Sequence, residues 1–229
     1  MAGQRILKRI LLSSTLIIIL TGILASGTTQ SEASGYHASI YLNAYPDGVD
    51  ALPSGEYAYN SLEMLGYSVD NVTNVNASYT YQRMRNDDIF YFSGHGGPGF
   101  MKFPDNSLII ASSPYEYDTK LSDYRDGEFD TMLLAVLNGC DTANNDSDLG
   151  NLMDEFMRLG VTTAIGFKTS INNDESNYWS DRFWYYLYEG HNVGDSAYIA
   201  RNDVLLKFGR FGGVDSYEIQ GDRYLTLSQ

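Results

Sequence analysis

The chain has 229 residues, a formal net charge of −14 and a hydrophobic fraction of 43%. This composition excludes a disordered chain and provides a sizeable core for one domain of about 200 residues. A surface this acidic repels phosphate backbones, so we expect no nucleic-acid partner.

The N-terminus predicts a targeting segment. Arg5, Lys8 and Arg9 precede an apolar run over 10–20, and small residues follow as far as Ala33. This order is typical of a signal peptide, so residues 1–33 predict a secreted or extracytoplasmic protein. If the segment stays uncleaved it serves as a signal anchor, which is the one membrane contact that we expect.

From residue 36 onward, apolar runs alternate with segments of helical spacing. The runs predict strands at 38–44, 67–75, 89–92, 132–137 and 161–167, and the spacing predicts helices near 54–65, 78–85, 149–160, 179–187 and 197–208. A hairpin is expected over 100–111, a tyrosine-rich surface insertion over 112–130, and a hairpin or edge strand over 217–227. The alternation predicts a single α/β domain over 36–229 with a mostly parallel sheet.

Two of these strands end in a reactive side chain inside a glycine-bearing turn. The run 89–92 leads to Ser-Gly-His95-Gly96, and the run 132–137 leads to Asn-Gly-Cys140-Asp141. Runs that are apolar throughout suit strands buried on both faces, and ligands bind beyond the carboxyl ends of such strands. We therefore expect His95 and Cys140, the only cysteine in the chain, to meet at one edge of the sheet.

This pair suits acyl transfer. A thiol attacks as its thiolate, and a histidine can take its proton and then give it to a leaving amine. The neighbouring glycines leave backbone N–H groups free to hold a developing oxyanion, for which Gly96 and Cys140 are the candidates. The residues predict a cysteine endopeptidase that acts on a peptide or protein substrate and needs no cofactor.

The two motifs, 45 residues apart, together resemble the caspase-like (clan CD) cysteine peptidases, and the segments after Cys140 look most like CHAT-type and related prokaryotic members. The resemblance covers roughly 38–208. It implies a caspase-hemoglobinase-like three-layer sandwich with helices on both faces of the sheet, and a His95–Cys140 dyad. The caspase pentapeptide Gln-Ala-Cys-Arg-Gly is absent, which leaves the preferred substrate side chain open.

Four carboxylates are candidates for further roles. Asp141 and Asp174 could line an acidic substrate pocket that favours Lys or Arg, although exposed loop carboxylates are the ordinary case. Asp146 and Asp148 could hold calcium through their oxygen atoms, as some caspase-like enzymes require, or could belong to a helix N-cap cluster.

Two other functions fit the sequence. In an α/β-hydrolase with Cys140 as nucleophile, His191 would follow in the right chain order, but that fold needs glycine where this chain has Asn138 and Thr142. The second alternative is a non-catalytic binding module that kept the caspase fold, because a fold does not fix a function.

Overall fold

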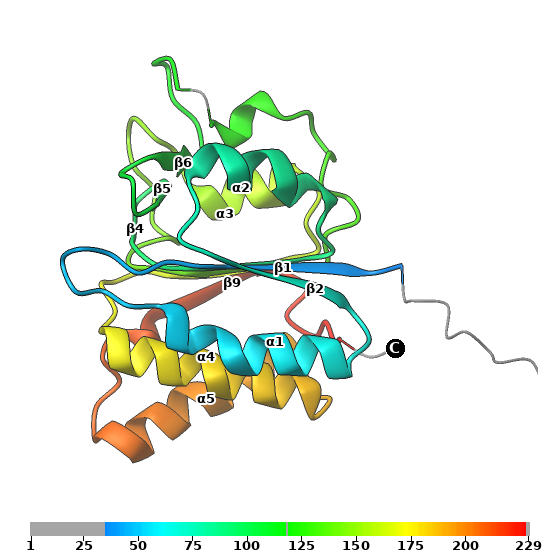
Figure 1. Cartoon of the computed structure of the whole chain (residues 1–229), viewed down its shortest axis with the longest axis vertical. Helices are drawn as coiled ribbons and strands as arrows, with labels where there is room; N and C mark the ends of the chain where they lie inside the picture. The colour runs from blue at the N-terminus through cyan, green and yellow to red at the C-terminus, as the bar shows by residue number, and fades with distance from the viewer. Residues whose placement is uncertain (1–34, 118, 228–229) are drawn as a thin grey trace, which may run out of the picture. The chain divides into compact units, whose positions relative to one another are not determined.

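A six-stranded sheet forms the middle layer of the computed structural model, which describes residues 35–117 and 119–227 (Figure 1). Its strand order is β2-β1-β3-β7-β8-β9. Neighbours from β2 to β8 pair in parallel, and β9 pairs with β8 in the antiparallel sense, so the predicted mostly parallel sheet is confirmed. The strands are β1 (His37–Leu42), β2 (Ser68–Thr73), β3 (Ile89–Ser93), β7 (Leu134–Asn138), β8 (Thr163–Phe167) and β9 (Tyr217–Gly221).

Helices cover both faces of this sheet. One face carries α1 (Gly55–Met64), α4 (Asn173–Tyr188) and α5 (Val193–Phe208), and the other carries α2 (Ala77–Arg83) and α3 (Leu152–Arg158) (Figure 1). Short 3-10 turns lie at Leu52–Ser54, Met84–Asn86, Leu121–Asp123 and Val214–Ser216. The expected three-layer sandwich is therefore present.

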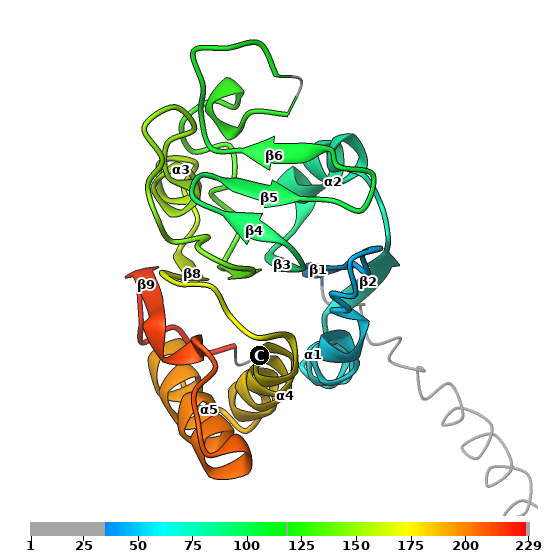
Figure 2. The ribbon, with the colours of Figure 1, turned by 90° about the vertical axis from the view of Figure 1, so that its left-hand side faces the viewer.

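A second, three-stranded sheet lies on the same side as α2 and α3 (Figure 2). It consists of β4 (Gly96–Gly97), β5 (Phe100–Lys102) and β6 (Leu108–Ile110), all antiparallel. The hairpin of β5 and β6 was expected, whereas β4, which begins directly after His95, was not. The segment 112–130 is only partly the surface insertion that its polarity predicts, because Leu121 and Phe129 are fully buried.

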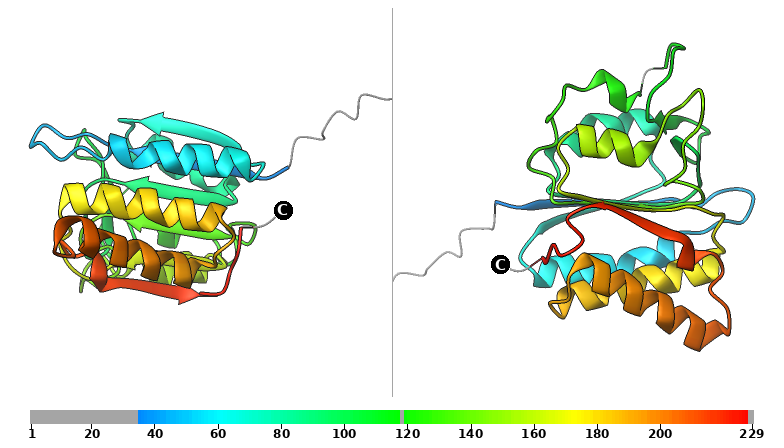
Figure 3. Two further views of the ribbon diagram at one scale, coloured as in Figure 1. Left: turned by 90° about the horizontal axis from the view of Figure 1, so that it is seen from below. Right: turned by 180° about the vertical axis from the view of Figure 1, so that it is seen from behind.

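The central strands supply two separate cores because their side chains alternate between the faces of the sheet. In β3, Ile89 and Tyr91 belong to the core under α1, α4 and α5, whereas Phe90 and Phe92 belong to the core under α2 and α3. The three helices of the first face run side by side, roughly along the direction of the strands (Figure 3). This two-sided burial explains why the strands read as unbroken apolar runs.

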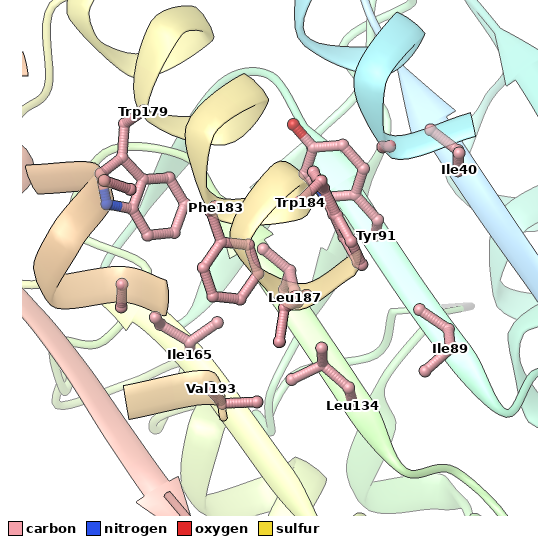
Figure 4. Close-up of a cluster of buried hydrophobic side chains, with 14 of the residues drawn as sticks. Ile40, Ile89, Tyr91, Leu134, Ile165, Trp179, Phe183, Trp184, Leu187 and Val193 are labelled. Atoms are coloured by element: carbon pink, nitrogen blue, oxygen red, sulfur yellow. The ribbon is translucent and has the colours of Figure 1, made fainter. Parts of the chain in front are cut away.

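Helix α4 is the main packing element of the first core. One stripe of its side chains faces the sheet and consists of Trp179, Phe183, Trp184 and Leu187 (Figure 4). The rings of Trp179 and Phe183 stack at 4.9 Å, and Trp184 contacts Tyr91 of β3 at 5.3 Å. Because this helix is firmly packed, the residues of its first turn have fixed positions beside the edge of the sheet where the strands end.

Strand β9 is an edge strand, as expected, but it covers only the first part of the predicted segment 217–227 and ends at Gly221. Among residues 35–117 and 119–227, no helix is long and apolar enough to cross a membrane. The predicted signal peptide or anchor over residues 1–33 lies outside the described residues.

Candidate active site

The turns that follow β3 and β7 lie side by side at the carboxyl edge of the sheet. The two strands are parallel neighbours with Ser93 opposite Asn138, and the Gly94 N–H donates to the Asn138 carbonyl across 3.1 Å. Figure 2 views the molecule from this edge. The register therefore brings the turn that carries His95 against the turn that carries Cys140, as expected from the two apolar runs.

Two glycines allow this close approach. A Cβ atom on Gly96 would lie 2.6 Å from Cγ2 of Thr142 and 2.9 Å from the carbonyl oxygen of Cys140. A Cβ atom on Gly139 would lie 3.0 Å from the Gly94 carbonyl oxygen. Any larger residue would push the two turns apart, so these glycines set the spacing between the histidine and the cysteine.

His95 is held by two residues from the loop after β1. Its Nε2 lies 2.9 Å from Oδ2 of Asp47, and its backbone N–H donates to the hydroxyl of Tyr45 across 3.0 Å. The Tyr45 ring lies 4.3 Å from the imidazole, and its hydroxyl donates to the Lys102 carbonyl. The hydrogen bond between Asp47 and His95 lowers the pKa of the Asp47 carboxyl, which therefore remains ionised near neutral pH.

The sulfur of Cys140 contacts the loop between β8 and α4. The Ile171 N–H donates to Sγ across 3.3 Å, and the Ile171 carbonyl lies 3.7 Å from the same sulfur. The backbone N–H of Cys140 itself has no hydrogen-bond acceptor within the described part of the chain.

The turn after Cys140 is fixed from below. Asp141 has a positive φ of 56°, a conformation that Asp tolerates better than most residues. The hydroxyl of the buried Thr142 lies 2.9 Å from the Leu137 carbonyl and accepts from the Phe167 N–H at 3.2 Å. These bonds tie the turn to β7 and β8, so the position of the sulfur depends on the sheet itself.

His95 and Cys140 line one cavity of about 70 Å³. Its other walls come from the loop after β1, the ends of β3 and β7, and the first turn of α4, and consist of Val49, Ala51, Ser93, Gly94, Asn138, Ile171, Asn173, Ser176 and Asn177. Both candidate dyad residues are half-buried, so the sulfur is reachable from this cavity.

The two carboxylates expected to line a substrate pocket are not among the residues that line this cavity, and their role in binding substrate stays a prediction. Asp141 Oδ1 accepts from Nδ2 of Asn144 at 2.9 Å, and Oδ2 accepts from Ser170 at 3.3 Å. Asp174 is exposed on the first turn of α4, whereas its neighbour Asn173 lines the cavity. The geometry thus gives neither aspartate a place in the wall beside Cys140.

The expected calcium residues form a turn in the loop before α3. Oδ1 of Asp146 accepts from the N–H groups of Asp148 and Leu149 at 2.7 and 2.9 Å. The N-cap of α3 is Asn151 and not this cluster. In the described ranges, no group of three or more His, Cys, Asp or Glu side chains could hold a metal ion. Calcium dependence stays a prediction.

His191 does not reach the candidate site. It follows α4, whose first turn lies at the cavity and whose 16 residues carry the chain about 24 Å along the helix axis. At that end its ring contacts Tyr186 at 5.6 Å. The α/β-hydrolase alternative, which needs this histidine beside Cys140, is therefore wrong.

The fold and the paired turns define a cysteine peptidase-like architecture, and comparison with solved structures agrees. The crystal structure of gingipain R (RGPB), an Arg-specific cysteine proteinase, matches 85% of this chain with a TM-score of 0.63 and 13% identity. The complex of the RgpB pro- and mature domains from Porphyromonas gingivalis matches 85% of this chain with a TM-score of 0.62 and 14% identity. No family model and no curated protein matches the chain.

These likenesses show that the chain has the caspase-like fold of the clan CD cysteine peptidases, as the sequence motifs predicted. The chain spans about half the length of the two gingipain structures, which it covers to 48% and 49%. The closer likeness to CHAT-type domains stays a prediction.

Proposed function

We propose that this protein is a cysteine endopeptidase in which Cys140 is the nucleophile and His95 the general acid and base. One observation carries the proposal: the two side chains line the same cavity at the carboxyl edge of the sheet. The imidazole is held by Asp47 and the sulfur by the Ile171 amide, which is the support that a reactive pair needs. The structural likeness to cysteine proteinases adds to this support.

The proposed reaction has two halves. Sγ of Cys140 gives its proton to Nδ1 of His95, because Nε2 is occupied by Asp47, and then forms a bond to the carbonyl carbon. The N–H groups of Gly96 and Cys140 would hold the oxyanion. The C–N bond breaks as His95 returns the proton to the amine, which leaves a thioester that water hydrolyses, with His95 again as base.

The substrate in this proposal is a peptide or protein outside the cytoplasm. The first part of that statement follows from the chemistry of the pair, and the second follows from the predicted signal peptide. An uncleaved segment would leave the enzyme tethered to a membrane, and either arrangement is compatible with the cavity. A labelled C-terminal fusion followed through cell fractionation, with the N-terminus of the mature protein sequenced, would separate the two.

The test is cleavage of a peptide mixture by the purified protein. Cys140→Ala should lower the rate of cleavage by a factor of about a thousand or more, because it removes the nucleophile. The unfolding midpoint should remain close to the wild-type value. His191→Ala is the matched control and should cleave normally. Wild-type cleavage by Cys140→Ala, or failure of a thiol-directed peptidyl probe to label Cys140, would favour the non-catalytic binding module.

A further inference from the structure

The cavity beside Cys140 has uncharged walls. Apart from His95 and Cys140, its lining residues are apolar, glycine, hydroxyl or amide residues. Asp47, which contacts His95, is not among them. A substrate side chain that enters this space would therefore meet no fixed charge that could pair with its own.

The floor of the cavity is a closed network of neutral groups. Asn138 is 1% exposed; its Oδ1 accepts from Ser176 at 2.9 Å, and its Nδ2 donates to Ser93 at 3.0 Å. Below them, the Tyr91 hydroxyl lies 2.9 Å from Oγ of Ser54. An ion placed against this floor would lose water and gain only neutral partners, which is unfavourable.

Two carboxylates that adjoin the lining residues in sequence, Glu175 and Asp141, are engaged elsewhere. Glu175, next to Ser176 in α4, is 1% exposed and forms an ion pair with Arg210. Asp141 is held by Asn144 and Ser170. Neither of these bonds has to break for a neutral substrate, whereas a cationic side chain would have to break one to pair with Glu175 or Asp141.

The cavity is small. A water molecule needs roughly 10–15 Å³ of such space, so a cavity of about 70 Å³ holds about five atoms of water size. An asparagine side chain has four non-hydrogen atoms and an arginine side chain has seven. The space therefore suits short side chains.

We infer that this enzyme cleaves after short, uncharged residues such as Ala, Ser, Thr or Asn. The inference rests on the proposed function, because it places in this cavity the side chain of the substrate residue whose backbone carbonyl Cys140 attacks. It departs from the Arg-specific proteinase to which the fold is similar. Asn173 at the rim and Ser176 in the floor are two of the polar groups available to such a side chain, and Ala51 and Ile171 supply apolar walls.

A peptide library with one fixed residue before the scissile bond and random flanks tests the inference. Asn and Asp form a near-isosteric pair that isolates charge, and Asn and Arg compare size and charge together. We expect kcat/KM for Ala, Ser and Asn to exceed that for Asp, Lys and Arg by at least about tenfold. Cleavage after Lys or Arg at an equal or higher rate, lost in Cys140→Ala, would overturn the inference while supporting the proposed function.

Peptidyl probes with Asn, Asp or Arg at the same position give a second readout, the rate at which Cys140 is alkylated. The Asn probe should react fastest. If no peptide is cleaved and no probe labels Cys140, the proposed function fails, and the inference fails with it.

Moving one charge tests whether this cavity selects the substrate. Asn173→Asp places a carboxylate at the rim with little change of shape and should raise relative cleavage after Lys and Arg about tenfold. Asp174→Asn, one residue further along α4 and outside the lining, is the matched control and should leave the preference unchanged. An unchanged preference in Asn173→Asp would overturn the inference.

Discussion

Nε2 of His95 lies 2.9 Å from Oδ2 of Asp47, although the two residues follow different strands. An N–H at Nε2 that donates to this carboxylate leaves the lone pair of Nδ1 free, and within the described residues Nδ1 makes no hydrogen bond. In the proposed reaction, Asp47 would thus fix which nitrogen exchanges a proton with the cysteine.

Asp47→Asn should lower kcat by roughly 10- to 100-fold with little change in KM, because the imidazole loses its orientation while the cavity keeps its shape. Asp47→Glu should restore part of the activity. Asp130→Asn, which changes an exposed aspartate remote from His95, is the control. A rise in KM as large as the fall in kcat, or no rescue of activity by Asp47→Glu, would contradict a positioning role.

Gly96→Ala should disable the site by crowding. The added methyl group would meet the Cys140 carbonyl oxygen at 2.9 Å, and a backbone atom cannot move aside without the turn. We expect a loss of about 1–3 kcal/mol in the free energy of unfolding, with nearly complete loss of cleavage. Gly35→Ala adds the same methyl group where no atom lies within 4 Å, so it should leave both values unchanged. Normal activity in Gly96→Ala would show that the spacing of the turns is not critical.

Asp181 should make the protein less stable at neutral than at acidic pH. Burial raises the pKa of this half-buried carboxyl to about 6, although Lys207 lowers it in part. In the unfolded chain the value is near ~3.9. The folded state therefore binds the proton more tightly, so this contribution to stability is complete below about pH 4 and is lost as the pH rises through 6.

Asp181→Asn should remove that dependence and raise the free energy of unfolding at pH 7.5 by roughly 1–2 kcal/mol, a value reduced for partial solvent screening. The difference in the free energy of unfolding between Asp181→Asn and the wild type should be smaller at pH 4.5. Urea titrations at both pH values measure it, with Asp174→Asn as the control. A variant that is less stable than the wild type at pH 7.5 would contradict the sign.

Much of the fold was predictable because the decisive signals are local. Unbroken apolar runs such as 89–92 require burial on both faces, and the helical stripe of α4 requires an apolar surface to cover it. The same logic placed His95 and Cys140 at one edge. Strand β4 was missed because two glycines carry no strand signal, and its pairing depends on β5, which is fixed elsewhere.

The supporting residues of the site were less predictable. Asp47 lies in a Pro-Asp-Gly turn, and these residues are typical of a chain reversal, so the sequence gives no reason to assign the aspartate a second role. A usable signal existed: the turn follows a strand parallel to β3, so its polar side chains end at the edge that carries His95. The Ile171 amide had no such signal, because every residue except proline has a backbone N–H and only the fold decides which one meets the sulfur.

The neutral network under the cavity joins residues that also hold the protein together. Tyr91 belongs to β3 and to the core against Trp184, whereas its hydroxyl supports the floor through Ser54. In the proposed enzyme, substrate selectivity and thermal stability would therefore depend on the same side chains. Substitutions in this floor that changed the substrate preference during evolution would also change the thermal stability of the protein.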